Sequence, residues 1–359
     1  MVYEGGRSIS GAYLAELYAP PTSSALIGVG EFLGLVFRFF SGYLSTVFQS
    51  PLILWSSTLL GYAITALSIP LVGFTSSWEF VVVLYTLDRI GKGLRAPARD
   101  VILAEVSEGI GVGKGFGMHE LLDQLGAFTG PLLVSILLVY YGYRIAYLAL
   151  LIPGLISIIL VAAAWYFYPK PRATSIRKHV LSVKGYSRSF WLYTIASCIL
   201  ALGFIHWSIA SYYLKQYRGL PGEVIGLIYA VAMLVDAVVA VPIGVLFDRI
   251  KTKVFLIIPL LIPVSITLLI LAPIELVYLV AIPWGVVMSS EESIMRAAIA
   301  VLVEPSKRPL AYGIFGLVFG FTWALGGFIY TLLLENPVYV LFYAISTSLI
   351  SIYLYSQIH

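Results

Sequence analysis

Basic side chains recur at helical spacing inside a long apolar stretch of this sequence. Arg89, Lys92, Arg95 and Arg99 lie three or four residues apart between positions 79 and 104. At 100° per residue of an α-helix, the four fall within a sector of roughly 120°. A charge at the centre of a bilayer costs about 2.5–3.5 kcal/mol on insertion scales, so each one needs a partner or a watery cavity. The spacing therefore predicts a basic stripe along one transmembrane helix.

The next apolar stretch contains titratable side chains that can face this basic stripe. His119 and Asp123 are one helical turn apart, and Glu120 is three residues from Asp123, so the acids can face the stripe. Protonation of Asp123 could then release or engage a charge partner, and we predict that Asp123 carries a coupling proton. Ion pairs that only hold helices together are the better interpretation for four residues: Arg95, Arg99, Asp100 and Glu120.

A second candidate for the proton carrier lies in the other half of the chain. Asp236 has no charge within one helical turn, so it is either protonated or paired with a cation across a cavity. The sequence is equally consistent with a protonated Asp236 that has no role in transport. Glu292 and Arg296 are spaced i,i+4 and can form an ion pair whose role is purely structural. His206 is expected to be a hydrogen-bonded core residue rather than a ligand.

Charged residues near the N-terminus raise a different possibility. Glu31 and Arg38 are seven residues apart, hence on one helix face but about 10.5 Å apart along the axis. They cannot pair directly, so each needs another helix or the cavity. Arg38 is the stronger candidate for holding an anionic group or a carboxylate. A carrier of a sugar, an organic anion or a metal ion is favoured if Arg7, Arg38 and Arg89 converge on the cavity.

The composition identifies the elements that must position these residues. Of 359 residues, 60% are hydrophobic and 11% are charged, against roughly 25% charged in a soluble domain. This excludes a soluble enzyme and a disordered chain and indicates an integral membrane protein. The one cysteine, Cys198, cannot form an internal disulfide.

Apolar runs broken by proline, glycine or charge predict eleven spans of transmembrane length. The predicted spans are 25–48, 51–74, 79–104, 115–141, 144–168, 190–216, 223–247, 253–272, 276–302, 309–334 and 338–357. Residues 1–19 stop short of a span and lack the features of a signal peptide. We interpret them as the outer half of a first helix whose inner half is missing from this sequence. A helix lying on the membrane surface is the alternative.

Basic residues predict the orientation of the chain. The connection 169–189 carries six basic residues and no acid, which places it in the cytoplasm by the positive-inside rule. Counting spans from there puts both termini in the cytoplasm of a multi-pass plasma-membrane protein, once the missing half-helix is restored. This basic linker divides the chain into an N-terminal bundle, 1–168, and a C-terminal bundle, 190–359. An internal repeat relates the two, since 98–117 matches 295–313, and such repeats are typical of secondary transporters.

Several motifs in this sequence resemble those of one transporter family. Asp248-Arg249, four residues after Gly244 and before a basic cluster, is similar to the cytoplasmic loop signature of the major facilitator superfamily. The segment 88–100 resembles helix four of a prokaryotic, drug-antiporter-like branch, and 126–131 resembles the helix-five motif of its antiporters. The resemblance implies an all-α membrane protein with the major facilitator fold. Two pseudo-symmetric six-helix bundles, the first helix truncated, would expose one central site alternately to each side.

The resemblance also implies a gate on the cytoplasmic side. We expect Asp248 and Arg249 to contact the N-terminal bundle when the outside is open, with Asp248 near the helix start at Lys114. The corresponding first-half segment around Thr46 lacks the acid and should make no such contact. The predicted gate residues are Asp248, Arg249, Arg95 and Arg99. The predicted substrate or proton pathway comprises Arg7, Glu31, Arg38, Arg89, His119, Glu120, Asp123, Asp236, Glu292 and Arg296.

These features predict a secondary active transporter that is not an enzyme and exports a small amphipathic or drug-like molecule in exchange for protons. The alternative is a symporter or facilitator for a sugar, an organic anion or a metal ion. A membrane-embedded lipid-modifying enzyme is the alternative from a different class. His119-Glu120-Leu-Leu-Asp123 lacks the second histidine of a zinc-protease helix, so we expect no metal and no cofactor. We expect the protein to interact with its substrate, with protons and with the bilayer, and not with nucleic acid. We also expect it to be a monomer.

Overall fold

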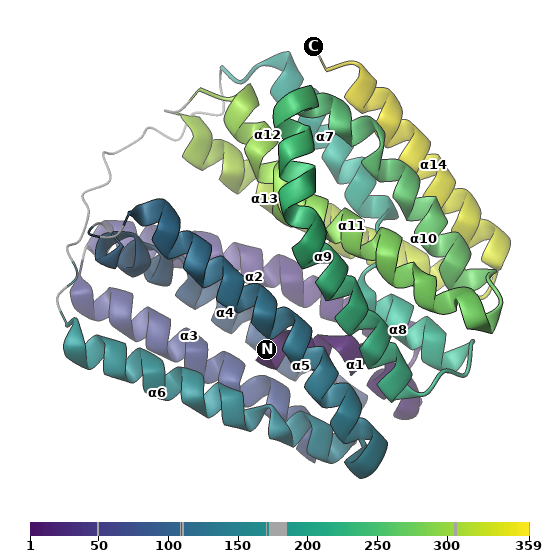
Figure 1. Ribbon diagram of the computed structural model, residues 1–359, viewed down its shortest axis with the longest axis horizontal. Coiled ribbons are helices and arrows are strands. Elements are labelled where there is room, and N and C mark those ends of the chain that lie inside the picture. The colour runs from purple at the N-terminus through teal and green to yellow at the C-terminus, as the bar shows by residue number, and fades with distance from the viewer. Residues whose placement is uncertain are drawn as a thin grey trace.

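A computed structural model describes residues 1–48, 50–107, 109, 111–169, 171, 185–304 and 307–358. Within these ranges the regular elements are all helical, and no residue lies in a strand. The expectation of an all-α membrane protein is confirmed. Figure 1 shows the earlier helices on one side of the molecule and the later helices on the other, with the N-terminus near the centre.

The described residues of the N-terminal part form six α-helices. They are α1 (Val2–Glu16), α2 (Pro21–Phe48), α3 (Pro51–Leu71), α4 (Trp78–Val106), α5 (Val112–Ala149) and α6 (Leu151–Phe167), with a 3-10 turn at Val72–Phe74. The hydroxyl of Ser77 caps α4 by accepting the Phe80 amide. Gly142 kinks α5 because it adopts φ 72°, which only glycine tolerates well. The kink falls between the predicted spans 115–141 and 144–168.

In the C-terminal part, the residues that the structure describes form eight α-helices. They are α7 (Arg188–Gly203), α8 (Trp207–Gln216), α9 (Gly222–Ile250), α10 (Leu261–Ile270), α11 (Ala281–Glu292), α12 (Ile294–Leu302), α13 (Arg308–Leu333) and α14 (Pro337–Ser356), with 3-10 turns at Lys251–Leu256, Ile258–Leu260 and Ile274–Val280. The predicted spans 190–216 and 276–302 lie within two segments that are long and apolar enough to cross a membrane, Arg188–Gln216 and Ile274–Leu302, but neither is one continuous helix. The first breaks at 204–206, and the second breaks at Ser293 between α11 and α12.

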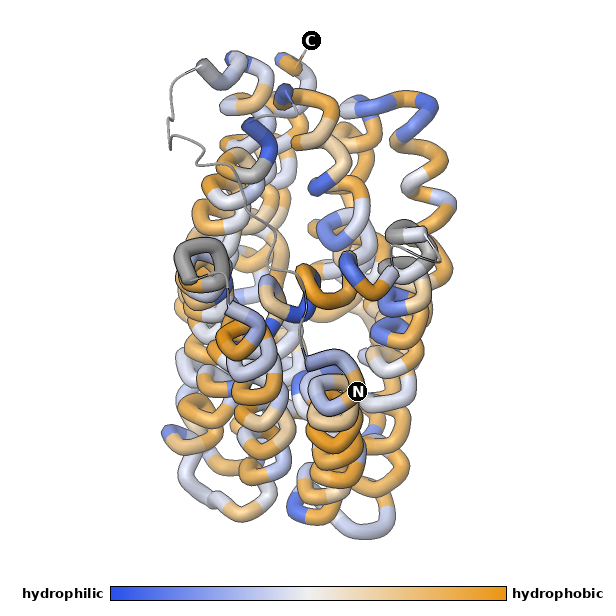
Figure 2. Tube along the Cα trace, turned by 90° about the vertical axis from the view of Figure 1, so that its left-hand side faces the viewer, coloured by the Kyte–Doolittle hydropathy of each residue, from blue (hydrophilic) through white to orange (hydrophobic). Residues whose placement is uncertain are grey.

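Eight segments of the described chain are long and apolar enough to cross a membrane. One of them, Met118–Phe167, is 50 residues long and covers most of two predicted spans, 115–141 and 144–168. The predicted span 79–104 is helical as α4 but carries too many charges to be recognised by composition. The predicted span 253–272 is helical only in short pieces, of which Ile258–Ile270 is apolar. Figure 2 shows long hydrophobic stretches along most helices, with hydrophilic residues at their ends and near the middle of the molecule.

Helix α1 is buried inside the bundle. Every residue from Gly5 to Ala15 is buried, so the alternative of a surface helix was wrong. Close packing requires its glycines, because a Cβ built at Gly11 would lie 1.8 Å from the Ser208 backbone oxygen in α8. A Cβ at Gly5 would meet Val134 of α5 at 3.2 Å. Helix α1 therefore packs against both sets of helices at once.

The two sets of helices touch at one end and separate at the other. Near the turns 16–21 and 216–222, which we name the far side, contact is tight. A Cβ at Gly222 would lie 2.2 Å from the Tyr143 hydroxyl, and one at Gly320 would lie 2.4 Å from Leu35. Toward the opposite, linker side, a Cβ at Gly244, Gly313 or Gly316 would meet nothing within 4 Å. The helices are thus closed on the far side and apart on the linker side.

This asymmetry gives a first testable prediction. If the linker side must close during a cycle, the open space beside Gly316 has to disappear, and Gly316→Trp will obstruct that closure. Overpacking costs about 1–3 kcal/mol, which shifts the equilibrium about 5–150-fold away from the closed state. We expect unchanged folding but strongly reduced transport in proteoliposomes. The matched control is Ile152→Trp on the exposed face of α6, which should transport normally. Equal activity of both variants would contradict the closure.

Candidate functional site

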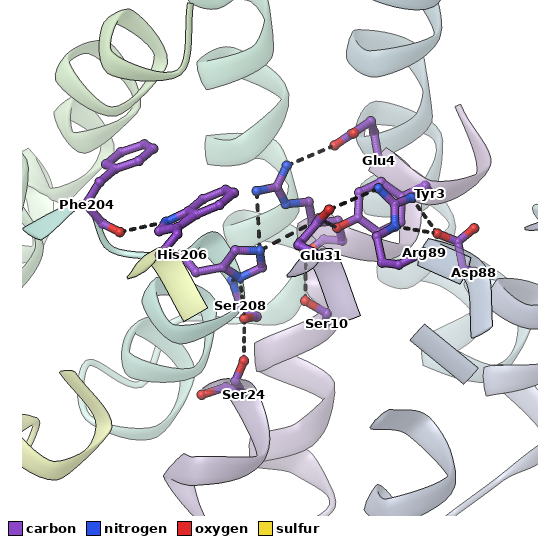
Figure 3. Close-up of polar contacts among 12 residues, drawn as sticks. Tyr3, Glu4, Ser10, Ser24, Glu31, Asp88, Arg89, Phe204, His206 and Ser208 are labelled. Carbon is purple, nitrogen blue, oxygen red and sulfur yellow. Dashed lines mark hydrogen bonds and ion pairs between the residues drawn. The ribbon is translucent and has the colours of Figure 1, made fainter. Parts of the chain in front are cut away.

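Charged side chains from three N-terminal helices meet α8 in the centre of the molecule (Figure 3). The Tyr3 hydroxyl of α1 donates a hydrogen bond to Glu31 Oε1 of α2. Arg89 Nη1 of α4 lies 3.4 Å from Glu31 Oε2. His206, the N-cap of α8, places Nε2 4.0 Å from Glu31 Oε1. Glu31 therefore connects α1, α2, α4 and the start of α8, and we name this group the central cluster.

Arg89 is the best satisfied cation of the central cluster. Its Nε lies 2.8 Å from Asp88 Oδ2, and its Nη2 donates to the same oxygen. The guanidinium carbon lies 3.0 Å from the centroid of the Tyr3 ring, which adds a cation–π contact. Asp88 is fully buried and Arg89 nearly so, so this pair needs its hydrogen bonds to offset desolvation.

Arg7 is buried but only loosely paired. Its Nη1 lies 3.8 Å from Glu4, its Nη2 lies 3.4 Å from His206, and its Nε has no hydrogen-bond partner. Four aromatic rings surround the guanidinium with centroids 5.8–5.9 Å away, from Tyr3, Tyr229, Trp284 and Trp323. The rings stabilise the buried charge without neutralising it. Three of these rings belong to the C-terminal helices α9, α11 and α13.

Polar contacts across the two sets of helices continue toward the far side. The Tyr229 hydroxyl donates to Glu4 at 2.6 Å, and Lys215 lies 2.8 Å from Glu16. The Ser208 hydroxyl donates to the Ser24 carbonyl at 2.7 Å. These contacts hold the two sets of helices together beside the central cluster and at the far side.

The break between α7 and α8 exposes backbone carbonyls at membrane depth, where each must find a donor. Aromatic side chains of α11, α13 and α14 supply all four. The bonds are Tyr343 to Leu202 O at 2.9 Å, Tyr330 to Gly203 O at 2.5 Å, Trp323 to Phe204 O at 2.8 Å and Trp284 to Ile205 O at 3.1 Å. All four backbone carbonyls at the break therefore accept a hydrogen bond, and the break holds His206 beside Glu31.

Removing one of these donors tests the stability of the break. Tyr330 is fully buried, so Tyr330→Phe deletes the hydroxyl without changing the shape and leaves the Gly203 carbonyl unpaired. We expect a loss of about 1–2 kcal/mol in the free energy of unfolding. Thermal unfolding of the detergent-solubilised protein measures it. Tyr353→Phe, at an exposed tyrosine of α14, is the control and should change little. Equal melting temperatures for all three proteins would contradict the role of the bond.

Three acids of the C-terminal helices lie near the central cluster without a cation partner. Asp236 of α9 is 2% exposed, and Glu291 and Glu292 end α11. In the described chain no Lys, Arg or His nitrogen lies within 4.0 Å of their carboxyl oxygens. Ser289, one turn before these glutamates, donates to the Asp236 backbone carbonyl at 2.9 Å and holds α11 against α9. We name Asp236, Glu291 and Glu292 the acid face.

Two sequence-based predictions about these residues change with the structure. The prediction that Glu292 and Arg296 form an i,i+4 pair within one helix was wrong, because α11 ends at Glu292 and α12 begins at Ile294. Arg296 remains within electrostatic reach of Glu292. Asp236 has no charge within a turn of its own helix, but Glu292 lies within reach from α11.

The predicted pathway residue Arg38 of α2 and the predicted gate residues Arg95 and Arg99 of α4 make contacts outside the central cluster. Arg38 lies 3.6 Å from Asp100, which Arg99 also contacts at 2.6 Å. Arg95 places its guanidinium 4.3 Å from the Tyr62 ring of α3. The predicted basic stripe therefore divides: Arg89 belongs to the central cluster, and Arg95 and Arg99 belong to contacts among N-terminal helices.

The predicted residues of α5 lie on the more open, linker side. Glu120 and Asp123 are both exposed, and His119 is half-buried. Glu120 accepts a hydrogen bond from Gln124 at 3.4 Å, while Asp123 is within electrostatic reach of Lys92 and Arg95. These positions fit the expectation that the acids face the basic stripe.

The predicted gate residues Asp248 and Arg249 are exposed at the linker-side end of α9. Neither forms an ion pair within 4.0 Å in the part of the chain that the structure describes. The side chains of Thr46 and Lys114 lie outside the described residues. Because the two sets of helices are separated on the linker side in this state, the gate contact of Asp248 and Arg249 stays a prediction for the state in which that side is closed. Among the described residues, no group of three or more metal-binding side chains is suitably placed.

Sequence reasoning missed several members of the central cluster. Tyr3, Glu4, Trp284 and Trp323 were not singled out, and His206 was expected only to be a core residue. A weak signal existed, because Glu4 and Arg7 are spaced i,i+3 in a helix too short to span. The aromatic residues carried no signal, since rings in a membrane protein are usually core or interface residues.

Comparison with known proteins places this geometry in a wider context. The model of the Major Facilitator Superfamily matches residues 6–213 and 192–356. Uncharacterised proteins of Mycobacterium tuberculosis and Mycobacterium bovis are 32% identical over 336 residues, covering 91% of this chain and 81% of theirs. An uncharacterised transporter of this superfamily from Methanocaldococcus jannaschii is 25% identical over 63% of this chain and 57% of its own.

Solved structures share the fold at low identity. The nucleoside transporter NupG has a TM-score of 0.76 at 14% identity and covers 99% of this chain and 96% of its own. The peptide transporter POT has a TM-score of 0.74 at 13% identity, covering 99% and 91%. A bacterial homologue of the human lysosomal transporter Spinster, in an inward-facing and unoccupied conformation, has a TM-score of 0.68 at 13% identity, covering 99% and 92%.

Proposed function

Because the chain belongs to the major facilitator superfamily, we propose that it is a proton-coupled secondary transporter that exports a small amphipathic molecule by alternating access. The fold, the closed far side and the separated linker side fit one state of such a cycle. The division into bundles 1–168 and 190–359, the cytoplasmic termini and the plasma-membrane location are parts of this proposal.

The observation that carries proton coupling is the acid face. A carboxylate inside a membrane protein needs a cation or a proton to neutralise it. Asp236 is buried and lies within electrostatic reach of three other acids, Glu292, Glu4 and Glu120. A bound proton is the remaining way to neutralise it in this state. When the helices rearrange, a cation that approaches Asp236 can displace that proton, which couples proton release to the conformational change.

The surroundings favour Asp236 over Asp123 as the coupling residue. Asp123 is exposed and already lies near Lys92 and Arg95, so it can stay charged without a proton. Asp236 has no such neighbours. The sequence-based choice of Asp123 is therefore the second option in this proposal.

The central arginines do not form a free anion site. Arg7 and Arg89 both contact Tyr3, but Arg38 pairs with Asp100 elsewhere. Arg89 is neutralised by Asp88 and Glu31, and Arg7 lies near Glu4. The convergence that would favour a carrier of a sugar, an organic anion or a metal ion at the centre is thus incomplete.

Transport into proteoliposomes with an imposed pH gradient tests the proposal. With an acidic lumen, an exchanged substrate should accumulate inside while the lumen becomes more alkaline, and a protonophore should abolish both signals. A panel of amphipathic compounds, with empty liposomes as the control, identifies the substrate. Substrate and protons moving in the same direction would replace export by symport. Chemical alteration of a lipid in detergent, without any gradient, would favour an enzyme instead.

A further inference from the structure

His206 lies in the central cluster with contacts that one neutral imidazole ring cannot all form as hydrogen bonds (Figure 3). Its Nε2 lies 3.4 Å from Arg7 Nη2 and 4.0 Å from Glu31 Oε1. Its Nδ1 lies 2.6 Å from the Ser208 hydroxyl and 3.2 Å from the Ser208 amide nitrogen. The side chain is buried, at 2% exposed, so its partners are protein groups. A neutral ring has one donor and one acceptor, and the position of its proton therefore decides which contacts are bonds.

Arg7 determines the tautomer in this state. A guanidinium has donors only, so Nε2 must accept from Arg7 and carries no proton. The proton of the neutral ring is then on Nδ1, which donates to the Ser208 hydroxyl, and that hydroxyl donates to the Ser24 carbonyl at 2.7 Å. The opposite tautomer would keep the longer amide contact but would set Nε2–H against the Arg7 donor. Neutral His206 thus connects Arg7 of α1 to Ser24 of α2.

The charges around His206 do not cancel while the ring is neutral. Three carboxylates of the central cluster are in contact with two guanidiniums: Glu4, Glu31 and Asp88 with Arg7 and Arg89. Three negative against two positive charges leave a net charge of −1, which a proton on His206 brings to zero. Two tyrosines that each donate to one of these carboxylates, and one further charge of each sign within electrostatic reach of Glu31, complete the surroundings: Tyr3, Tyr229, Lys92 and Glu291.

A proton on Nε2 exchanges the partners of the ring. Imidazolium has no lone pair, so the Arg7 contact becomes a repulsion, and Glu31 becomes the acceptor of a charge-assisted hydrogen bond. Arg7 can move aside because its Nη1 is 3.8 Å from Glu4 and its Nε has no hydrogen-bond partner. The Trp323 ring of α13, whose centroid lies 5.1 Å from that of His206, then lies beside a cation. Charged His206 is therefore attracted to α2 on one side and to α13 on the other.

We propose that His206 is a pH-sensitive switch that holds the far side closed when it is protonated. Separation of the two sets of helices must take the charged ring away from Glu31 or from Trp323, whichever set α8 follows, so each route loses an attraction that neutral His206 lacks. Acidification therefore lowers the population in which the far side is open. This inference rests on the proposed alternating access, and it assigns to His206 control of the opening, while the coupling proton stays with Asp236.

Thiol labelling of the detergent-solubilised protein measures this opening even when the open state is rare. Ala19→Cys, at a 2% exposed position of the far side, should react with a methanethiosulfonate only in the open state, and Tyr18→Cys, at a 95% exposed position, supplies the reference rate at each pH. Both are placed in a Cys198→Ala, Asp236→Asn background, so that neither the native thiol nor the coupling acid contributes. From about pH 8 to about pH 5.5, the ratio of the two rates should fall about 10–100-fold, as for a gained charge-assisted hydrogen bond.

Three further variants identify the titrating group. His206→Gln keeps an uncharged acceptor beside Arg7 but cannot take a proton, so its ratio should not change with pH. His119→Gln, the same change at a half-buried histidine of α5, is the matched control and should keep the full pH dependence. Arg7→Met removes the competitor for Nε2 and should move the midpoint upward by about one pH unit, a tenfold gain in proton affinity. The Arg7 variant also gives a result if His206→Gln fails to fold.

The outcomes distinguish the switch from the proposed function. The same pH dependence with and without His206, a rate ratio that rises on acidification, or an unchanged midpoint in Arg7→Met would overturn the switch. pH-driven uptake by the native protein together with pH-independent labelling would also contradict this inference and leave the proposed function standing. Labelling that depends on pH through His206, in a protein without pH-driven uptake, would do the reverse.

Discussion

Asp236→Asn is expected to abolish transport driven by a pH gradient while substrate exchange without a gradient stays measurable. Asparagine has nearly the same shape as a protonated aspartate and keeps the packing against α11, but it can neither bind nor release a proton. Because Asp236 is buried on the acid face without a cation partner, the variant mimics the protonated state permanently. The protein should therefore still bind and exchange substrate, and it should lose only the coupling.

Uptake into proteoliposomes with and without a pH gradient separates these two activities. Asp123→Asn is the matched control, since it makes the same chemical change at an exposed position. It should retain gradient-driven uptake. Loss of coupling in the Asp123 variant alone would restore the sequence-based assignment. Retention of coupling in both variants would make a uniporter the better interpretation.

Arg89→Met should give the largest loss of stability of any single substitution considered. It removes the cation that Asp88 and Glu31 share and leaves the fully buried Asp88 carboxylate without its partner. Breaking a buried ion pair in this way costs about 3–5 kcal/mol. Thermal unfolding in detergent and the yield of folded protein are the measurements. Arg99→Met removes a more exposed cation and should cost only about 0–1 kcal/mol.

A double variant distinguishes loss of the pair from a general packing defect. In Asp88→Asn combined with Arg89→Met, the orphaned charge is gone, so stability should recover by at least about 1 kcal/mol relative to Arg89→Met alone. Additive losses would show that the methionine disrupts packing and that the ion pair contributes little. The yield of the double variant also remains informative if Arg89→Met fails to fold.

Periodicity and composition predicted most of the fold because a bilayer imposes strict rules on length and polarity. The boundary between the spans 115–141 and 144–168 was readable from Gly142, and α1 was recognised although it is only 15 residues long. The breaks in 190–216 and 276–302 were not readable. No proline stands at either break, and the partners that make the first break possible lie on other helices far along the chain.

The candidate site was predictable only where its residues are unusual in a membrane. Charges such as Glu31, Arg89 and Asp236 stand out because each is costly there. Their partners were not predictable, since pairing depends on which helices become neighbours. Glu31 reaches Arg89 58 residues away and lies near His206 in the other set of helices. Spacing within one helix suggested the pair Glu292 and Arg296, which the break at Ser293 separates.

The break between α7 and α8 affects how the far side can open. The carbonyls before it are held by C-terminal helices, whereas α8 is bonded to the N-terminal helices. The bonds of α8 are Trp207 to Ser8 O at 2.9 Å, Ala12 N to Ser211 at 3.0 Å, Tyr212 to Ala19 O at 2.7 Å, Ser208 to Ser24 O at 2.7 Å and Lys215 to Glu16 at 2.8 Å. Rigid rotation of the whole C-terminal set would rupture all five together.

Residues 204–206 offer another route. They lie between the two helices, and their backbone bonds to them are confined to the last turn of α7 and the first turn of α8, from Phe204 N to Leu200 O at 3.0 Å and from Ala210 N to His206 O at 3.2 Å. With a bend there, α8 can stay on α1 and α2 while α7 leaves with its aromatic partners. These three residues thus act as a joint, and bending there strains the bonds from Trp323 to Phe204 O and from Trp284 to Ile205 O while it spares the α8 contacts.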